Sequence, residues 1–216
     1  QPAPKVKKAV KRIQWNEAYA KNGATIEKGS KMAVLNLGSK DGYYDLAEET
    51  SELVAGLEDF TISVYFKVEG TNKLDGYGHF LFAFSKLAEN SANDGPYVAM
   101  RLNEQRFETS TGGYQHEEIV MQGGKPVRDV WVHALFRQSG HHGELYLDGK
   151  LIGKNEKMPI VKEIFKEAPA CCWIGKAPFK GDKYLSQTCV ADFAIYNYAV
   201  TDKELNKLVS KRSQLK

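Results

Sequence analysis

Strict alternation of apolar and polar side chains from Phe60 to Val68 restricts the fold of this chain more than any other feature of its sequence. The even-numbered positions from 62 to 68 are Ile, Val, Phe and Val, and the odd-numbered positions from 61 to 67 are Thr, Ser, Tyr and Lys. Because successive side chains of a β-strand point to opposite faces of its sheet, this period predicts a strand with one buried face.

Short apolar runs separated by Gly, Asn and Asp continue along the chain. The clearest are residues 80–84, 97–102, 131–136 and 143–153. In the last run, Asp148-Gly149 stands between two apolar stretches, and this pair favours the positive φ angles of a tight hairpin turn. Thr201 and Glu204 have the spacing of a helix capping box and precede Leu205, so the tail predicts the one helix. The expected fold is all-β, a sandwich or barrel with a short C-terminal helix.

The first residues differ in composition from the rest. Residues 1–12 contain five Lys or Arg and no acid, which predicts a basic lead-in or linker over residues 1–13 and a single domain over residues 14–216. The whole chain has 30 Lys+Arg and 27 Asp+Glu, a net charge of 30 − 27 = +3. This charge is too small to favour nucleic acid as a partner. No apolar run reaches the roughly 18 residues of a membrane helix, so membrane insertion is not expected.

The three cysteines, Cys171, Cys172 and Cys189, have no Cys-x-x-Cys or Cys/His spacing that would bind zinc. By strand alternation Cys189 shares a face with Phe193, and Cys172 shares a face with Ile174. We therefore expect both cysteines to be buried on inward faces. Two alternatives remain open, namely three buried thiols or a disulfide between Cys172 and Cys189 in an oxidising compartment.

The histidines favour structural roles over metal binding. His141 and His142 are adjacent, so their side chains diverge, and they precede the predicted hairpin turn in what reads as an exposed loop. His133 lies two residues after Trp131 in a predicted strand, which favours a structural position.

Taken in order, several segments resemble the laminin G-like domain of the concanavalin A-like lectin/glucanase superfamily, which is often found in secreted bacterial proteins. They are residues 42–46 (GYYDL), 60–67 (FTISVYFK), 131–135 (WVHAL), 145–150 (LYLDGK) and 192–197 (DFAIYN), followed by Leu205 of the tail. The resemblance covers about residues 24 to 209 and implies a jelly-roll sandwich of two antiparallel sheets with a short C-terminal helix.

Members of this family often carry a structural calcium ion, and the resemblance implies Asp192 and Asp45 as its candidate ligands here. Calcium needs several oxygen ligands that converge from different segments. Thr188 and Ala191 stand where the family often has a Gly and the first of two Asp residues before the last strand. The loss of that carboxylate counts against the ion, so its presence remains open.

Glycan-cleaving enzymes with this sandwich place two carboxylates on one face of a strand. The dense acidic groups are Glu48-Glu49 with Glu52, and Glu117-Glu118, and both lie beside loop signals. Neither has the E-x-D-x-x-E spacing of the related glucanases. Nucleophile-elbow, phosphate-loop and H-E-x-x-H motifs are also absent from the sequence. We therefore expect a protein that is not an enzyme.

Aromatic and planar polar side chains are the groups that bind sugars, through ring stacking and paired hydrogen bonds. Tyr97 and Arg101 lie on the non-core face of their predicted strand, Tyr114 and His116 follow a Gly-Gly pair, and Tyr77 precedes Gly78. These residues, Tyr77, Tyr97, Arg101, Tyr114 and His116, are the candidate ligand-binding residues. The alternative is that such tyrosines only cover neighbouring strands through cross-strand pairs.

The resemblance and the lack of paired catalytic acids together predict a non-catalytic carbohydrate-binding or accessory module. We expect it to be secreted, periplasmic or on the cell surface, with a polysaccharide or glycan as its partner and a catalytic domain as its neighbour. One alternative is a protein-interaction or structural spacer module attached to a glycan-processing enzyme. A divergent glycoside hydrolase is the second alternative.

Overall fold

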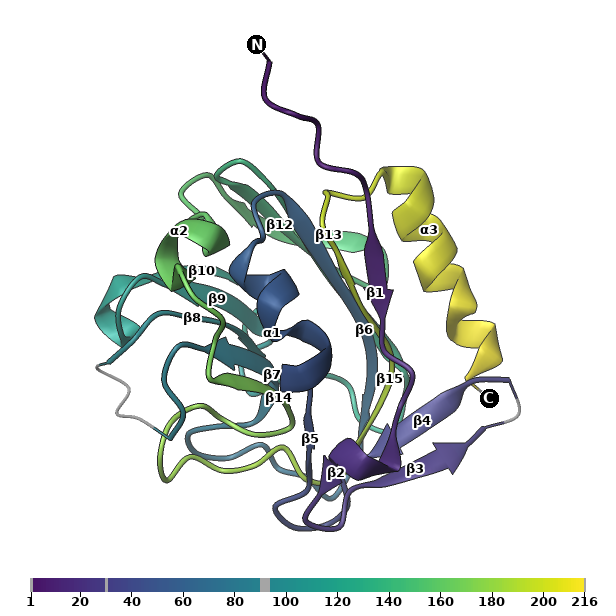
Figure 1. Ribbon diagram of the computed structural model, residues 1–216. Helices are drawn as coiled ribbons and strands as arrows, with labels where there is room; N and C mark the ends of the chain where they lie inside the picture. The colour runs from purple at the N-terminus through teal and green to yellow at the C-terminus, as the bar shows by residue number, and fades with distance from the viewer. Residues whose placement is uncertain (1, 30, 90–93, 216) are drawn as a thin grey trace.

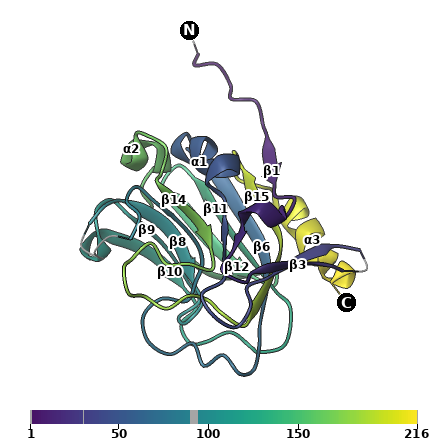
Figure 2. The ribbon, with the colours of Figure 1, turned by 60° about the horizontal axis from the view of Figure 1, so that its bottom comes forward.

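Two antiparallel sheets lie face to face in the computed structural model, which describes residues 2–29, 31–89 and 94–215 (Figure 1, Figure 2). The first sheet is built from β1 (Val10–Arg12), β3 (Thr25–Lys28), β4 (Ala33–Asn36), β6 (Phe60–Val68), β11 (Val132–Ser139), β12 (His142–Leu147), β13 (Lys150–Asn155) and β15 (Thr188–Tyr196). Its order is β13-β12-β11-β6-β15-β4-β3, and β1 also pairs with β15.

The second sheet contains β2 (Ala20–Lys21), β5 (Tyr43–Asp45), β7 (Phe80–Ser85), β8 (Tyr97–Arg101), β9 (Arg106–Ser110), β10 (Glu117–Met121) and β14 (Cys171–Ile174). Its order is β10-β9-β8-β7-β14-β5-β2. The helices are α1 (Ala47–Ala55), α2 (Val161–Phe165) and α3 (Asp202–Ser210), with short 3-10 turns at Glu17–Tyr19, Tyr114–His116 and Lys211–Gln214. The predicted sandwich of two antiparallel sheets with a C-terminal helix is confirmed.

The core forms where the inward faces of the two sheets meet. The predicted alternation of β6 is confirmed, because the even-numbered residues from Ile62 to Val68 all belong to the central apolar cluster. Phe107 of the second sheet stacks on Phe136 of the first with ring centroids 3.6 Å apart. The hairpin turn is also confirmed, since Asp148 and Gly149 have φ angles of 50° and 78° between β12 and β13.

A bulge in β15 overturns the predicted orientation of Cys189. Asp192 has a φ of 51°, and the pairing of β15 with β6 shifts register between Ala191 and Ala194. Val190 and Phe193 therefore both face the core, whereas Ala191 packs on the outer face against Tyr65. Since the alternation reverses at the bulge, Cys189 lies on the outer side and not on the face of Phe193.

Burial of the cysteines is confirmed even though the face of Cys189 is not. Cys171, Cys172 and Cys189 are all buried free thiols. Cys172 points into the core from the second sheet, and Cys189 belongs to the first. The structure therefore corresponds to the alternative of three buried thiols.

The folded domain begins earlier than predicted. Residues 10–12 form β1 and pair with the last residues of β15, so they are not part of a lead-in. Ile13 is 5% exposed and its N–H donates to the carbonyl of Phe193. Arg12 forms an ion pair with Asp192. Even before Val10 the chain contacts the body, because the N–H of Ala9 donates to Asn197 Oδ1 at 2.7 Å and Asn197 donates to the carbonyl of Lys7 at 3.0 Å. The exposed residues that precede Lys7 in the described chain extend away from the sandwich (Figure 1).

Helix α1 was not expected from the sequence. Glu48 and Glu49, which the sequence places beside loop signals, lie in its first turn, where carboxylates interact favourably with the positive end of the helix dipole. The helix is held to the sandwich by the buried residues Thr50 and Val54.

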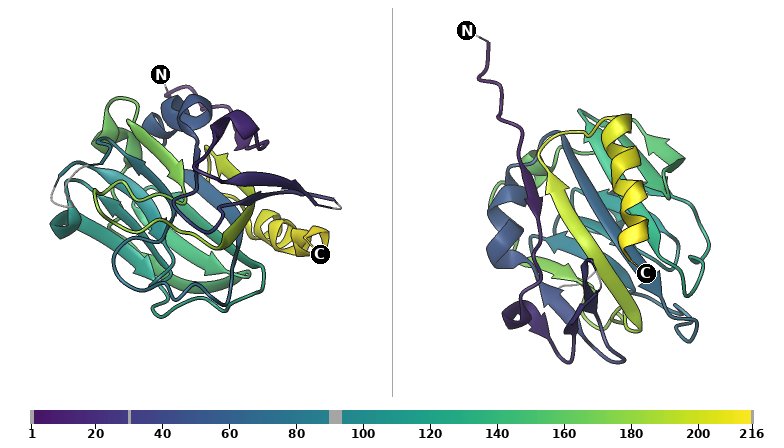
Figure 3. Two further views of the ribbon diagram at one scale, coloured as in Figure 1. Left: turned by 90° about the horizontal axis from the view of Figure 1, so that it is seen from below. Right: turned by 90° about the vertical axis from the view of Figure 1, so that its right-hand side faces the viewer.

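The C-terminal helix α3 lies across the outer face of the first sheet (Figure 3). Leu205 and Leu208 pack against Leu135 and Tyr196 of this sheet. Beneath the helix, the hydroxyl of Tyr65 donates to the carbonyl of Leu208 at 2.6 Å. This cover explains why the outer face of β6, although polar in sequence, is buried.

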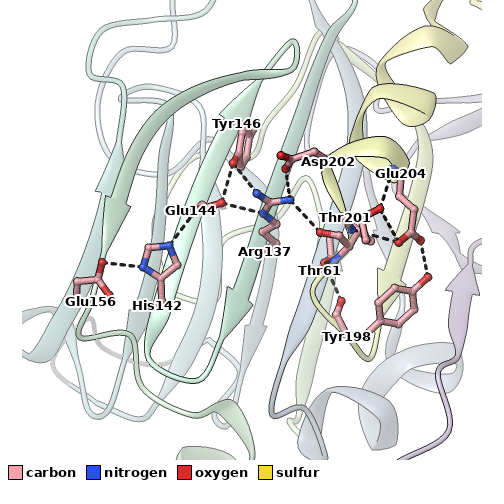
Figure 4. A network of polar contacts seen from close by, with 11 residues as sticks. Thr61, Arg137, His142, Glu144, Tyr146, Glu156, Tyr198, Thr201, Asp202 and Glu204 are labelled. Carbon is pink, nitrogen blue, oxygen red and sulfur yellow. Dashed lines mark hydrogen bonds and ion pairs between the residues drawn. The ribbon is translucent and has the colours of Figure 1, made fainter.

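A polar network fixes the start of α3 on the first sheet (Figure 4). Arg137 of β11 forms ion pairs with Glu144 at 2.8 Å and with Asp202 of α3 at 2.9 Å. His142 lies between Glu144, at 2.9 Å, and Glu156, at 2.7 Å. Adjacent acids therefore surround His142, which the sequence spacing did not reveal.

We expect Thr201→Ala to lower the free energy of unfolding by about 1 kcal/mol. The predicted capping box is present, because Thr201 Oγ1 accepts the N–H of Glu204 at 3.2 Å and Glu204 Oε1 accepts the N–H of Thr201 at 3.2 Å. Urea denaturation measures the change, and Thr201→Ser, which keeps the hydroxyl, is the control. Equal losses in both variants would show that the cap is not responsible.

Among the described residues, no helix combines the length and apolar character that crossing a membrane would require.

Candidate ligand-binding site

A hollow of about 620 Å³ lies where the chain crosses between the two sheets, and we call it the loop-end hollow. Three connections line it, from β4 to β5, from β6 to β7 and from β14 to β15. Its lining consists of residues 39–41, 72–75, 79, 181–184 and 186. All three connections join strands of different sheets, so the sandwich itself brings them to the same end.

A close backbone contact joins two of these loops. The N–H of Lys183 donates to the carbonyl of Tyr77 at 3.0 Å, and the N–H of His79 donates to the carbonyl of Lys183 at 3.0 Å. Gly78 lies between them with a φ of 111°. A Cβ at Gly78 would lie 2.6 Å from the backbone nitrogen of Lys183 and closer still to its carbonyl oxygen. Only glycine allows this approach, which shapes one wall of the hollow.

Side chains fix the shape of the β6 to β7 loop. Asn72 donates to the carbonyl of Ser186 at 2.6 Å and accepts the N–H of Leu74 at 2.9 Å. His79 Nε2 lies 2.9 Å from the carbonyl oxygen of Asp75. Since a carbonyl only accepts, Nε2 carries the proton. Burial lowers the pKa of His79, so the ring is neutral and its Nδ1 is an acceptor that no described residue satisfies.

Asp182 supplies a carboxylate to the hollow. This carboxylate is half-buried, and no hydrogen bond or ion pair from the described residues ends on it. Burial raises the pKa of Asp182, while the nearby Arg101 lowers it in part. A half-buried acceptor without a protein donor is a group that a ligand hydroxyl can satisfy.

Tyr184 forms the boundary between the hollow and a cluster of aromatic rings. The ammonium of Lys176 lies 4.1 Å from the ring centroid of Trp173, 4.8 Å from Tyr43 and 5.7 Å from Tyr184. Lys176 also forms an ion pair with Glu89 at 3.1 Å. These cation–π contacts fix the half-buried ring of Tyr184 at the edge of the hollow.

The structure places Tyr97 on the outer face of β8, as predicted, but its ring is fully buried. The connection from β14 to β15 crosses this face, and the ring of Phe179 packs edge-on against Tyr97 at 5.1 Å. The Tyr97 hydroxyl donates to Glu117. Because the ring has no free face, the expectation that Tyr97 stacks on a sugar is wrong for this structure.

Arg101 also lies on the predicted face, at the end of β8 nearer the hollow. It forms ion pairs with Glu104 at 3.5 Å and Glu108 at 3.9 Å. Its proximity to Asp182 connects it electrostatically to the hollow, although it does not line it.

The remaining predicted residues do not converge on one place. Tyr77 is 79% exposed and lies beside the loop-end hollow through its backbone contact with Lys183. Tyr114 and His116 line a separate hollow of about 370 Å³ with Gly112 and Gln115, next to the first residues of β10. Tyr114 is 52% exposed there.

Two carboxylates of the second sheet lie close together on its outer face. Arg106 pairs with Glu108 at 2.8 Å and also with Glu117, which lies in β10 and not in a loop. Glu108 is 1% exposed, and burial raises its pKa to about 7. Both carboxylates are thus held by an arginine under cover of the surrounding side chains.

The proposed calcium ligands do not fit a shared site. The Asp192 carboxylate lies between Arg12 and Lys211 on the first sheet, with Lys211 at 3.3 Å. Asp45 lies in the second sheet, where it accepts the N–H of Ala47 at 2.9 Å. In the part of the chain that the structure describes, no three His, Cys, Asp or Glu side chains are grouped to hold a metal ion.

Sequence reasoning missed most residues of the hollow, including Asn72, Asp75, Asp182 and Tyr184. One signal was available, because the connection over residues 175–187 is long and contains Pro178 and Phe179. Connections of more than about 12 residues are often functional.

A sequence profile described as the concanavalin A-like lectin/glucanases superfamily matches residues 38–206. A search of curated protein sequences finds no match. Among solved structures, domain 4 of AbnA, an extracellular GH43 arabinanase from Geobacillus stearothermophilus, was determined in complex with arabinotriose. It aligns with a TM-score of 0.63 and 14% identity over 88% of this chain and 82% of that chain.

Two larger proteins contain a similar fold. The receptor binding domain of botulinum neurotoxin D aligns with a TM-score of 0.57 and 11% identity over 95% of this chain and 48% of that chain. Trypanosoma rangeli sialidase, in complex with 2,3-difluoro-KDN, aligns with a TM-score of 0.55 and 14% identity over 88% of this chain and 29% of that chain. This chain therefore spans less than half of either protein, and such identities establish the fold alone.

Proposed function

Because this chain belongs to the concanavalin A-like lectin/glucanases superfamily, we propose that it is a carbohydrate-binding module whose loop-end hollow holds the sugar. Fold alone does not fix function. The observation that supports this proposal is the Asp182 carboxylate, which lines the hollow with no hydrogen-bond donor among the described residues.

The lining suits the chemistry of a sugar. Asp182 would accept one or two hydroxyl hydrogens, as a carboxylate with free lone pairs does. Tyr184, at the edge of the hollow, would offer its ring to the apolar face of a pyranose or furanose. Domain 4 of the arabinanase, which shares the fold, is known in complex with a sugar.

We further propose that the module is not catalytic. A retaining glycosidase needs two accessible carboxylates roughly 5 Å apart beside the sugar. Glu108 and Glu117 are two carboxylates that share one partner, but Arg106 binds both and Glu108 is 1% exposed. The absence of any released reducing sugar after incubation with a glycan panel is the expected result, and release would contradict the proposal.

Secretion, or display on the cell surface, is part of the same proposal, together with attachment to a glycan-processing enzyme. Its support is the extracellular arabinanase to which the similar domain belongs. If the protein is instead a protein-interaction or spacer module, calorimetry should detect no heat of binding with any glycan.

We expect Tyr184→Ala and Asp182→Asn each to weaken glycan binding roughly tenfold, because one removes ring stacking and the other a charge-assisted hydrogen bond. Isothermal titration calorimetry with a panel of plant and host glycans measures the affinities. Tyr114→Ala is the matched control, since Tyr114 is an exposed tyrosine in the other hollow. Loss of binding in Tyr114→Ala alone would move the site there, and no binding by the unmodified protein would favour the spacer role.

A further inference from the structure

Charged side chains line the loop-end hollow in equal numbers, with Lys40, Lys73 and Lys183 against Asp41, Asp75 and Asp182. None of the three lysines forms an ion pair with a described residue. What distinguishes the hollow is therefore how these charges are placed, and not their sum.

The lysines gather at the corner of the hollow formed by Asp75. Lys125 donates to Asp75 Oδ1 at 2.7 Å and to the carbonyl of Lys73 at 2.6 Å. The side chain of Lys183 passes over Gly76, where a Cβ would lie 3.5 Å from its Cε and from its Nζ. Lys125 lowers the pKa of Asp75, and Lys73 and Lys183 lower it further. Three lysines thus act on one carboxylate, and only Lys125 forms an ion pair with it.

The Asp182 carboxylate has a different neighbour. Burial raises the pKa of Asp182, and Arg101 lowers it in part. Asp41 is exposed at the rim. The hollow thus presents a carboxylate without a protein donor at Asp182 and, at the Asp75 corner, two lysines, Lys73 and Lys183, that form no ion pair with a described residue.

We propose that the loop-end hollow selects an acidic glycan, whose anionic group binds Lys73, Lys125 and Lys183 at the Asp75 corner while sugar hydroxyls meet Asp182. This inference rests on the proposed carbohydrate-binding function and names its ligand class. The anion is the carboxylate of a uronic acid residue or a sulfate ester, since ammonium groups bind either through charge-assisted hydrogen bonds. Lys125 is held in place by its bonds to Asp75 and to the carbonyl of Lys73, and Lys73 and Lys183 complete the corner.

Calorimetry with oligogalacturonate, its carboxyl-reduced neutral counterpart and a sulfated galactan tests the proposal. We expect the acidic ligands to bind more tightly than the neutral one. Lys73→Gln and Lys183→Gln should each weaken oligogalacturonate binding roughly fivefold, the size of a partly exposed ion pair. Raising the salt concentration from about 0.1 M to about 1 M shortens the Debye length from ~10 Å to ~3 Å, so it should also weaken the binding of oligogalacturonate to the unmodified protein. Lys203→Gln, at an exposed position of α3, is the matched control and should change nothing.

The outcomes separate this inference from the proposed function. Equal affinity for the acidic and the neutral oligosaccharide, or lysine variants that behave like Lys203→Gln, would overturn the selection for acidic glycans while sugar binding stands. Binding of the sulfated galactan alone would support the anion site and assign it to sulfate esters. If no glycan binds at all, while circular dichroism shows a folded protein, both proposals fail.

Discussion

The variant Gly78→Ala is expected to lose ligand binding at the loop-end hollow together with roughly 3 kcal/mol of unfolding free energy. A Cβ at this position would meet the backbone of Lys183, with its nitrogen at 2.6 Å, so the two loops must separate. The φ of 111° adds a backbone conformation that alanine rarely adopts. Urea denaturation and calorimetry with a bound glycan measure the two losses.

Gly181→Ala is the matched control for this experiment. Gly181 lies in the same connection as Lys183 and has a φ of 85°, but nothing lies within 4 Å of a Cβ built there. Gly181→Ala should therefore lower the free energy of unfolding by only about 1 kcal/mol, through backbone strain, and leave ligand binding intact. Equal losses in the two variants would mean that strain, and not the contact between the loops, determines the effect.

Lowering the pH from neutral to about 4.5 should reduce the free energy of unfolding by about 3 kcal/mol through His133. His133 is fully buried, its Nε2 lies 2.8 Å from Ser63 Oγ, and its ring lies 4.7 Å from that of Tyr65. Burial lowers the pKa of His133 to about 3. Because the unfolded chain binds this proton near pH 6.5 and the folded protein does not, stability is complete above pH 6.5 and falls as the pH drops toward 3.

Urea denaturation at several pH values, for the unmodified protein and for His133→Gln, isolates this effect. The difference in unfolding free energy between the two should shrink as the pH falls. His142→Gln is the control with the opposite sign, since Glu144 and Glu156 raise the pKa of His142 and its contribution is lost as the pH rises. NMR of the unmodified protein gives a second readout, in which the His142 ring titrates and the His133 ring does not. A His133 titration above pH 6 would contradict the prediction.

The strands and the terminal helix were predictable because their signals are local. The alternation of β6, the Asp148-Gly149 turn and the Thr201 cap each depend on residues close in sequence. The face of Cys189 was not predictable by the same rule. The orientation of Cys189 depends on the bulge at Asp192, and a single Asp in an apolar strand does not predict a bulge.

The candidate site was predictable only in part, because it depends on which loops meet. Alternation correctly placed Tyr97 and Arg101 outside the core, but nothing in the sequence showed that Phe179 would cover Tyr97. The contact of Gly78 with Lys183 joins two loops far apart in the chain. Such contacts arise from the sandwich as a whole, so the residues of the hollow appear as ordinary loop residues until the sheets are assembled.

The position of β15 determines the order in which the protein can fold during its synthesis. This strand lies beside β6 on one side and beside β4 and β1 on the other, so it fills the middle of the first sheet. Until the ribosome has translated past Tyr196, β6 has one open edge, and β1 and β4 lack their partner. Pairing across so long a stretch of chain is slow, and unpaired edges invite association with other nascent chains. The edges of the earlier strands therefore stay unpaired until β15, the last strand of the sandwich, has been made.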